Sequence, residues 1–147
     1  MEFQTLFEKA NGQPILYKGK ELVQLDKINL SANTIALKIT FLSTDSKYTQ
    51  GIVLRTKGEF EIEGTRLSKM TVLWEDTAPK EVDIIVRSKD KMLYIYNAWK
   101  TEKCAFESWY NGAAIYIEEI DGAKIFHCND GFPDDDFNDL VFKVEFL

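Results

Sequence analysis

An acidic segment near the C-terminus, residues 129–139, carries the side chains best suited to chemistry. Five aspartates fall within the ten residues from Asp130 to Asp139, and no Lys or Arg lies among them. Carboxylates held about 6 Å apart in a folded loop repel by roughly 3 kcal/mol per pair at an effective dielectric constant of about 20. We therefore expect the segment either to stay open to water or to bind a cation.

Calcium is the cation that fits these donor types. It takes 6–8 oxygen ligands in flexible geometry, from Asp, Asn and backbone carbonyl groups. Side chains two residues apart can converge on one ion, so the alternation predicts Asp134, Asp136 and Asn138 as inward-pointing ligands, with Asp139 entering from the start of a strand. Asp135 should then point to water.

Other interpretations of this segment have to be weighed. An acidic run is usually a solvated loop, because Asp and Asn side chains bond their own backbone in turns. The aromatic Phe137 and the apolar run that starts at Leu140 favour an ordered site instead. An EF-hand is excluded, because Asp139 stands where its loop requires Gly and no helical pattern enters the loop.

The amino-acid composition restricts the classes of protein to which the chain can belong. The 147 residues suit a single domain, 1–147, and 45% hydrophobic and 13% aromatic content are those of a packed globule. The net charge is −6, and the positive residues are scattered along the sequence. We therefore expect neither nucleic acid nor a membrane as a partner, since both would need clustered Lys and Arg or a long apolar span.

The first nine residues lack a basic segment followed by an apolar one, which predicts no cleavable secretory signal. We expect a cytoplasmic protein, or one exported by a route without such a signal. Cys104 and Cys128 are then expected as reduced thiols. Cytosolic calcium is scarce, so a cytoplasmic site would have to be tight.

The rest of the chain reads as strands. Segments 35–41, 82–87 and 113–118 alternate apolar and polar residues with a period of two. Turn signals separate them at short intervals, at Lys57-Gly58, Glu63-Gly64, Ser88-Lys89-Asp90, Asn111-Gly112 and Asp121-Gly122. About nine or ten short strands predict an all-β, antiparallel β-sandwich, of which the jelly roll is one form.

One short N-terminal segment has helical spacing. Phe3, Leu6, Phe7 and Ala10 fall at i, i+3, i+4 and i+7, and Asn11-Gly12 is a typical helix stop. A helix this short is marginal in isolation, so it should form only where its apolar face packs on the sandwich.

The acidic segment resembles the calcium loop of bacterial two-calcium lectins that bind fucose and mannose. It is also similar to that of larger bacterial calcium-binding β-sandwich domains with the pattern Asp-x-Asp-Phe-Asn-Asp-Leu-Val. The resemblance covers about the last 20 residues, and Phe132-Pro133 makes the loop one residue longer than in the lectins. It implies that Asp134, Asp136, Asn138 and Asp139 bind calcium and that the ion coordinates sugar hydroxyls. Asp130, in the matching Asp-Gly stretch, is a further candidate metal ligand.

A second candidate ligand-binding segment is Trp109, Tyr110 and Asn111, whose aromatic rings could stack on a sugar, although Trp is more often a core residue. His127 adjoins Cys128 on an expected strand, so the two side chains should face opposite ways and form no catalytic pair. No catalytic residues are predicted. The sequence thus favours a non-enzymatic, calcium-dependent carbohydrate-binding module; the alternative is a protein-binding or scaffold protein in which the ion is only structural.

Overall fold

The structure is a computed structural model that describes residues 2–147, and antiparallel strands make up most of it. One helix comes first, α1 (Gln4–Lys9). The described part of the chain then forms ten strands: β1 (Ile15–Tyr17), β2 (Lys20–Val23), β3 (Asp26–Asn29), β4 (Thr34–Thr44), β5 (Thr49–Ile62), β6 (Thr65–Trp74), β7 (Glu81–Lys100), β8 (Ala114–Ile120), β9 (Ala123–Asn129) and β10 (Leu140–Phe146).

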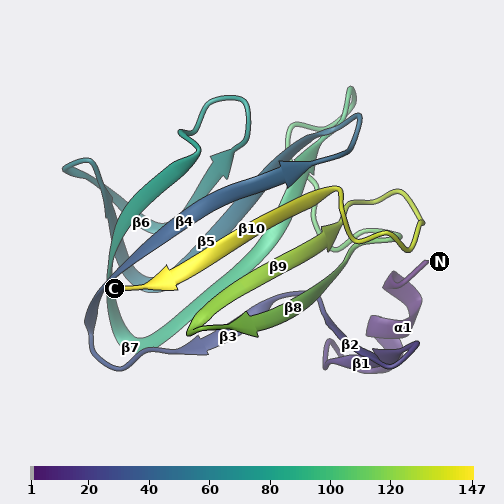
Figure 1. Ribbon diagram of the computed structural model, residues 1–147, viewed down its shortest axis with the longest axis horizontal. Helices are drawn as coiled ribbons and strands as arrows, with labels where there is room; N and C mark the ends of the chain where they lie inside the picture. Colours follow the sequence, from purple (N-terminus) through teal and green to yellow (C-terminus); the bar gives the residue numbers. More distant parts are fainter. Residues whose placement is uncertain (1) are drawn as a thin grey trace.

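The strands form one continuous sheet that folds over into two layers. The hydrogen-bonded order is β1-β2-β8-β9-β10-β4-β7-β5-β6, and β3 also pairs with β7. The long strand β7 joins the layers, because its first part, 81–87, pairs with β4 and its residues 85–88 and 93–100 pair with β5. Figure 1 shows β4, β10, β9 and β8 in one layer, with β5, β6 and β7 behind it. The predicted antiparallel sandwich is confirmed, while the jelly-roll form stays a prediction.

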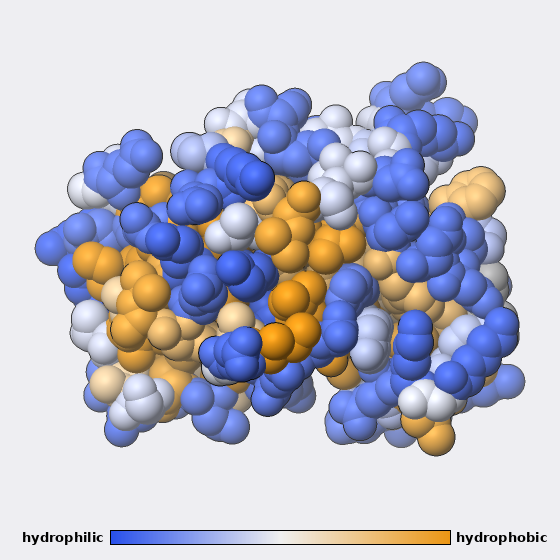
Figure 2. Space-filling view, in the orientation of Figure 1, coloured by the Kyte–Doolittle hydropathy of each residue, from blue (hydrophilic) through white to orange (hydrophobic). Residues whose placement is uncertain are grey.

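The core lies between these layers. Inward-facing residues alternate along each strand, as with Leu37 and Ile39 of β4, which are fully buried. Phe126 of β9 and Phe142 of β10 stack with ring centroids 4.5 Å apart. Burial of each such side chain contributes about 1.5–3 kcal/mol before conformational entropy is subtracted. The outer surface is largely hydrophilic, with apolar side chains interrupting it on the face shown in Figure 2.

Two of the predicted turns are tight hairpins. Asp121-Gly122 joins β8 to β9 with φ of 51° and 79°, and Glu63-Gly64 joins β5 to β6 with nearly the same values. Positive φ at both positions is the signature of the type I′ turn.

Two other predicted turns are wrong, because the strands continue through them. Lys57-Gly58 lies within β5 and Ser88-Lys89-Asp90 within β7, and the pairing register of the two strands shifts there. A Cβ atom on Gly58 would lie 1.9 Å from the carbonyl oxygen of Arg87, so the close approach of the strands requires glycine. Glycine and polar residues mark a strand bulge here rather than a chain reversal.

The predicted N-terminal helix forms and packs as expected. Phe3 and Phe7 are buried in a second, smaller cluster that includes Phe137 of the acidic segment. Asn11 and Gly12 end the helix with φ of 54° and 76°, a left-handed conformation that Asn and Gly tolerate.

The cysteines and the membrane prediction can also be checked against the structure. Cys104 and Cys128 are free, and Cys128 is buried. Burial raises the pKa of the Cys128 thiol well above its usual value, which keeps it protonated and unreactive. Among residues 2–147, no helix is both long and apolar enough to cross a bilayer.

Candidate functional site

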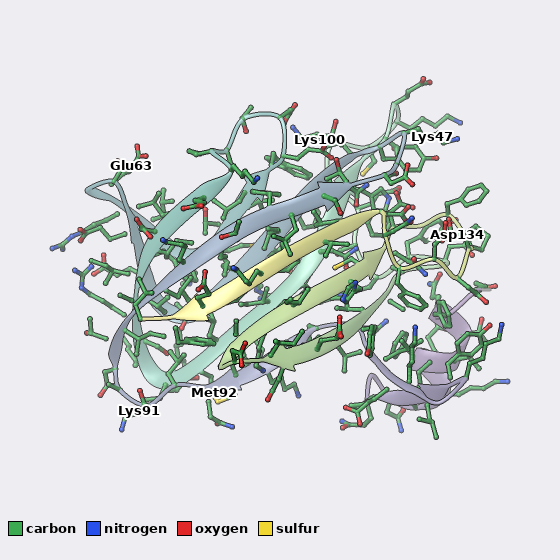
Figure 3. The ribbon with its side chains drawn as sticks, in the orientation of Figure 1. Lys47, Glu63, Lys91, Met92, Lys100 and Asp134 are labelled. Atoms are coloured by element: carbon green, nitrogen blue, oxygen red, sulfur yellow. The ribbon has the colours of Figure 1, made fainter. Side chains whose placement is uncertain are left out.

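The acidic segment forms an irregular loop at one end of the sandwich, between the end of β9 and the start of β10. Figure 3 shows Asp134 at this end and Glu63 and Lys91 at the other. The last residue of β9, Asn129, organises the loop. Its Nδ2 donates to the carbonyl oxygen of Asp134 at 2.9 Å, and its Oδ1 accepts from the backbone N–H of Phe137 at 2.8 Å. One buried amide thus fixes two points of the loop.

Two aspartates of the loop are almost fully buried. Asp130 is 1% exposed and Asp139 is 4% exposed, and Oδ2 of Asp139 accepts from the backbone N–H of Asp130 at 2.8 Å. Asp130 in turn accepts from the hydroxyl of Ser46 and from Nε2 of Gln50, the latter at 3.1 Å. These bonds tie the loop to the connection between β4 and β5 and to the first residues of β5.

Burial and nearby carboxylates raise the pKa values of two aspartates of the loop. Burial, together with the side chain of Asp136, raises the pKa of Asp134 to about 6. Burial also raises the pKa of Asp139 to about 7, and the charges of Asp130 and Asp134 act in the same direction. Both shifts mean that the folded protein disfavours the fully ionised loop when no cation is present.

The loop also holds oxygen atoms that lack hydrogen-bond donors. In the described part of the chain, four buried side-chain polar atoms have no partner, and three of them are oxygens at or beside this loop: Asp134 Oδ1, Asn138 Oδ1 and Gln50 Oε1. Buried acceptors are normally satisfied, and an unpaired one costs about 1–3 kcal/mol. A cation can coordinate oxygen atoms that receive no hydrogen bond. This set of unpaired oxygens therefore fits a hard divalent metal ion.

In the structure, the candidate metal ligands do not surround one common point. Within residues 2–147, no three His, Cys, Asp or Glu side chains form a group arranged to hold a metal ion. Asp136 is exposed rather than directed inward, although its carboxylate lies close enough to Asp134 to raise the pKa of that residue. An ion would therefore have to draw Asp136 toward the other oxygens.

Asp135 points away from the other carboxylates, as predicted, but it does not face water alone. Its Oδ2 accepts from the hydroxyl of Tyr17 at 2.8 Å and forms an ion pair with Lys18 at 3.2 Å. Tyr17 and Lys18 lie at the β1–β2 hairpin. Asp135 thus attaches the loop to this hairpin.

The second predicted ligand-binding segment lies directly against the loop. The backbone N–H of Gly112 donates to the carbonyl oxygen of Gly131 at 3.2 Å, and a Cβ atom on Gly112 would lie 2.6 Å from the carbonyl oxygen of Phe132. Two segments singled out separately in the sequence are therefore neighbours in the fold. Their exposed rings are Tyr110, at 55%, and Phe132, at 56%.

The other two residues of this segment are structural. Trp109 packs against Tyr96 with ring centroids 4.7 Å apart, and its Nε1 donates to the carbonyl oxygen of Gln24 at 3.0 Å. Asn111 accepts through its carbonyl oxygen from the backbone N–H of Gln4 at 2.9 Å, which joins the segment to α1. Of the two aromatic residues in this segment, Tyr110 has an exposed ring, whereas the ring of Trp109 packs on Tyr96.

His127 is explained by a local pair. Its Nε2 lies at hydrogen-bond distance from Oε1 of Glu118, and its ring stacks on that of Tyr116 with centroids 5.4 Å apart. Cys128 beside it is buried, so the two side chains face opposite sides of β9. This arrangement brings no nucleophile to the imidazole.

Sequence reasoning missed the residues that position the loop from a distance. Ser46 and Gln50 reach Asp130 across 84 and 80 residues of sequence, so no local pattern points to them. Phe132 also escaped notice, although its place between two turn-forming residues, Gly131 and Pro133, could have suggested an exposed ring.

Comparison with protein-family models, with curated proteins and with solved structures finds no match to this chain.

Proposed function

We propose that the protein is a non-enzymatic binding module whose C-terminal loop takes a calcium ion. The observation that supports this most directly is the set of buried oxygens without donors, Asp134 Oδ1 and Asn138 Oδ1 in the loop and Gln50 Oε1 beside it. The set contains only carboxylate and amide oxygens, which are ligand types that Ca²⁺ prefers. The positive charge of the bound ion would also offset the burial and the repulsion between carboxylates that raise the pKa values of Asp134 and Asp139.

The loop residues divide into ion ligands and a positioning residue. Asp134, Asp136, Asn138 and Asp139 would supply oxygens to the ion. Asp130 already accepts from Ser46, from Gln50 and from the backbone N–H of Phe132. Its role is therefore to hold Asp139 and the β4–β5 connection in place rather than to bind the ion.

The ligand that we propose for the module is a carbohydrate. Tyr110 and Phe132 are exposed on two segments whose backbones touch beside the acidic loop. Large exposed aromatic rings next to polar groups are typical of binding surfaces. A calcium ion at the exposed Asp136 could coordinate sugar hydroxyls while a ring packs on the apolar side of the sugar.

A second candidate function follows from the burial of the loop. Asp130 and Asp139 are so enclosed that an ion held close to them would face the protein more than the solvent. The ion would then only fasten the β9–β10 loop to the β4–β5 connection, and Tyr110 and Phe132 would contact a protein partner.

A glycan array in calcium and in EDTA separates these candidates. Carbohydrate binding predicts glycan signals that appear only with calcium and that are lost in Tyr110→Ala and in Phe132→Ala. The control is Phe106→Ala, which removes an exposed ring that packs on Trp74. An array without glycan signal in either buffer would reject the sugar and leave the structural ion, whereas signals that persist in EDTA would reject the role of calcium.

A further inference from the structure

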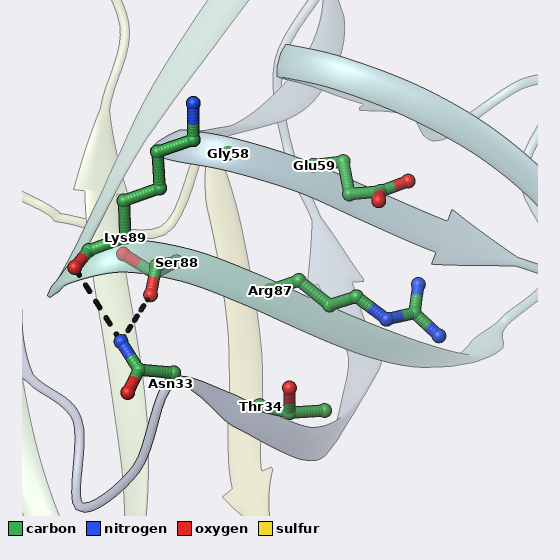
Figure 4. Close-up of a pocket in the computed structure, with 7 residues that line it drawn as sticks. All are labelled: Asn33, Thr34, Gly58, Glu59, Arg87, Ser88 and Lys89. Atoms are coloured by element: carbon green, nitrogen blue, oxygen red, sulfur yellow. Dashed lines mark hydrogen bonds between the residues drawn. The ribbon is translucent and has the colours of Figure 1, made fainter.

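A groove on the other half of the molecule gathers positive charge. It lies where β5 and β7 bend and has a volume of about 720 Å³, within the range of small-molecule sites. Four cationic side chains line it together with two aromatic ones: Arg55, Lys57, Lys69, Lys89, Tyr94 and Tyr96. Figure 4 shows an adjoining pocket at the same bend, with Lys89 rising beside Gly58 and Arg87 farther along β7.

Irregular strand pairing places three of these lysines. Between the pairs Arg55↔Met70 and Glu59↔Ser68, strand β6 has only Lys69, opposite three residues of β5. On the other side of β5, Lys57 lies in the register shift, opposite the stretch of β7 that includes Lys89. Each of the three neighbouring strands thus contributes one lysine from its bulge. Bulges re-aim side chains and are common beside functional sites.

The backbone of Lys69 is strained. Its φ is 58°, a left-handed conformation that few residues other than Gly, Asn and Asp adopt. A lysine in this place costs stability relative to glycine, and nothing in the hydrogen bonding of β6 requires its side chain. Strain of this kind collects at functional sites.

The protein neutralises the positive charge of the groove only in part. Within residues 2–147, none of its four cations takes part in an ion pair. The one carboxylate in the lining is Asp90, whose Oδ1 accepts from the hydroxyl of Ser88 at 3.0 Å and from the backbone N–H of Met92 at 3.1 Å. The hydrogen bond from Ser88 and, to a smaller extent, the charge of Lys57 lower the pKa of Asp90. Four cations against one anion leave a local charge of +3 in a chain of net charge −6.

We propose that this groove binds a small anion that carries several phosphate groups. Several negative charges on one molecule would meet cations contributed by three strands, and Arg55 could bind a phosphate through two parallel hydrogen bonds. Tyr94 is half-buried and Tyr96 buried, so their rings give the groove an apolar wall. The same phosphate chemistry occurs in inorganic polyphosphate and in phosphorylated organic molecules, and only the latter would use this wall.

The site can be tested by calorimetric titration of the full chain at low ionic strength in EDTA, which keeps the calcium site out of the measurement. Inorganic tripolyphosphate serves as the anion without an organic part, and ATP as the anion with one. Lys69→Gly is the main variant, and Lys91→Gly is its matched control. Lys91 has the same φ of 58° and the same charge, but it does not line the groove.

The two variants should behave alike in folding and differently in binding. Both relieve a left-handed backbone, so neither should melt below the unaltered protein. Lys69→Gly should weaken tripolyphosphate binding about fivefold or more, and Lys91→Gly should leave it within about twofold.

Three results would overturn the proposal: no binding of either anion to the unaltered protein, equal losses in the two variants, or binding unchanged in Lys69→Gly. Equal losses would mean diffuse attraction by surface charge. If binding follows the expected pattern, tighter binding of ATP than of tripolyphosphate identifies a phosphorylated organic ligand, and equal binding identifies inorganic polyphosphate.

Discussion

Asp135 and Asp136 are neighbours in the sequence, yet they serve different parts of the molecule. Asp135 bonds Tyr17 and Lys18 at the β1–β2 hairpin, and these donors lower the pKa of its carboxyl group. Asp136 lies beside Asp134 and raises the pKa of that residue. The chain bends at Asp135, so the two side chains have different neighbours although both are exposed, whereas the sequence pattern predicted Asp136 to point inward.

This division predicts how single substitutions change calcium affinity. Asp136→Ala and Asp139→Ala should each weaken calcium binding at least tenfold, a loss of about 1.4 kcal/mol or more, because each removes a charged ligand. Asp135→Ala should change the affinity little, since its partners are Tyr17 and Lys18. Titration calorimetry of the three variants checks this. If Asp135→Ala weakens binding as much as Asp136→Ala does, the loop is a diffuse acidic patch rather than a coordination site.

The pKa values of the loop predict an unusual dependence of stability on pH. The folded pKa of Asp139 is about 7 and that of Asp134 about 6, against 3.8 for an ordinary aspartate. An aspartate whose pKa is higher in the folded than in the unfolded protein stabilises the fold fully at pH values below its pKa in the unfolded state. This stabilisation is lost as the pH rises through its pKa in the folded state. In EDTA, the melting temperature should therefore fall between about pH 4 and pH 7.

Asp139→Asn provides the control for this pH dependence, because it removes the main titrating group while keeping the shape of the side chain. Melting curves of the variant in EDTA should change less with pH over the same range. A melting temperature that rises steadily from pH 4 to pH 7 in the unaltered protein would contradict the raised pKa values.

How far the site could be predicted depends on the distance over which its parts interact. The spacing of Asp134, Asp136 and Asn138 is local, and the sequence displays it directly. The hydrogen bonds from Ser46 and Gln50 to Asp130 depend on how the strands are ordered in the sheet, which no local pattern contains. The exposure of Asp136 depends on the loop conformation and was likewise beyond local reasoning.

At the scale of elements, the acidic loop and the N-terminal helix depend on one another. Phe137 lies 5% exposed among the apolar residues of the second cluster, and its ring centroid is 5.9 Å from that of Phe3. Its φ of 54° is one that a phenylalanine rarely adopts. Packing against α1 therefore holds the middle of the loop in a backbone conformation that is unfavourable for phenylalanine.

Phe137→Ala should therefore disturb both elements. Loss of the buried ring should lower the free energy of unfolding by about 3 kcal/mol, because the cavity left between α1 and the loop cannot fully collapse. It should also weaken calcium binding, since the neighbouring ligands lose their support. Urea unfolding and calcium titration measure the two effects.

The control for Phe137→Ala is Phe146→Ala, which removes the same ring from a position 38% exposed on β10. It should cost much less stability and leave calcium binding unchanged. Equal losses in the two variants would mean that Phe137 has no special part in shaping the loop.

Element boundaries show where local patterns are ambiguous. Asp121-Gly122 and Lys57-Gly58 look alike in the sequence, since each places a polar residue before glycine between apolar runs. The first reverses the chain and the second bends a strand that continues. The difference lies in the partner strand, because Arg87 of β7 packs so closely on Gly58 that the chain cannot turn away from it.

At the scale of the whole molecule, folding sorts charges that the sequence leaves mixed. The positive residues looked scattered along the chain, but the bends of β5, β6 and β7 collect Arg55, Lys57, Lys69 and Lys89 around one groove. Five aspartates lie in the loop around Asp134, at the end of the sandwich where Figure 3 labels this residue. Strand order makes neighbours of the four cations, whereas the five aspartates of the loop are already close in the sequence.

Calcium bound at the acidic loop should stabilise the molecule as a whole. The loop joins β9 and β10 to the β4–β5 connection through Asp130, and through Asp135 and Phe137 it reaches the β1–β2 hairpin and α1. Only the folded chain brings these segments together, so the ion should bind the folded state alone. For a Kd of about 10 µM, about 1 mM calcium would add about 2.7 kcal/mol to the free energy of unfolding.

For a chain of this length, that stabilisation corresponds to a rise in melting temperature of roughly 5–10 °C over the protein in EDTA. Magnesium at the same concentration should produce a much smaller rise, because it demands near-octahedral geometry and sheds its water reluctantly. Differential scanning calorimetry at pH 8, where Asp134 and Asp139 are ionised, measures both. Identical melting curves in calcium and in EDTA would contradict a calcium site in the loop. Equal shifts with calcium and magnesium would mean that the loop only attracts divalent charge without coordinating the ion.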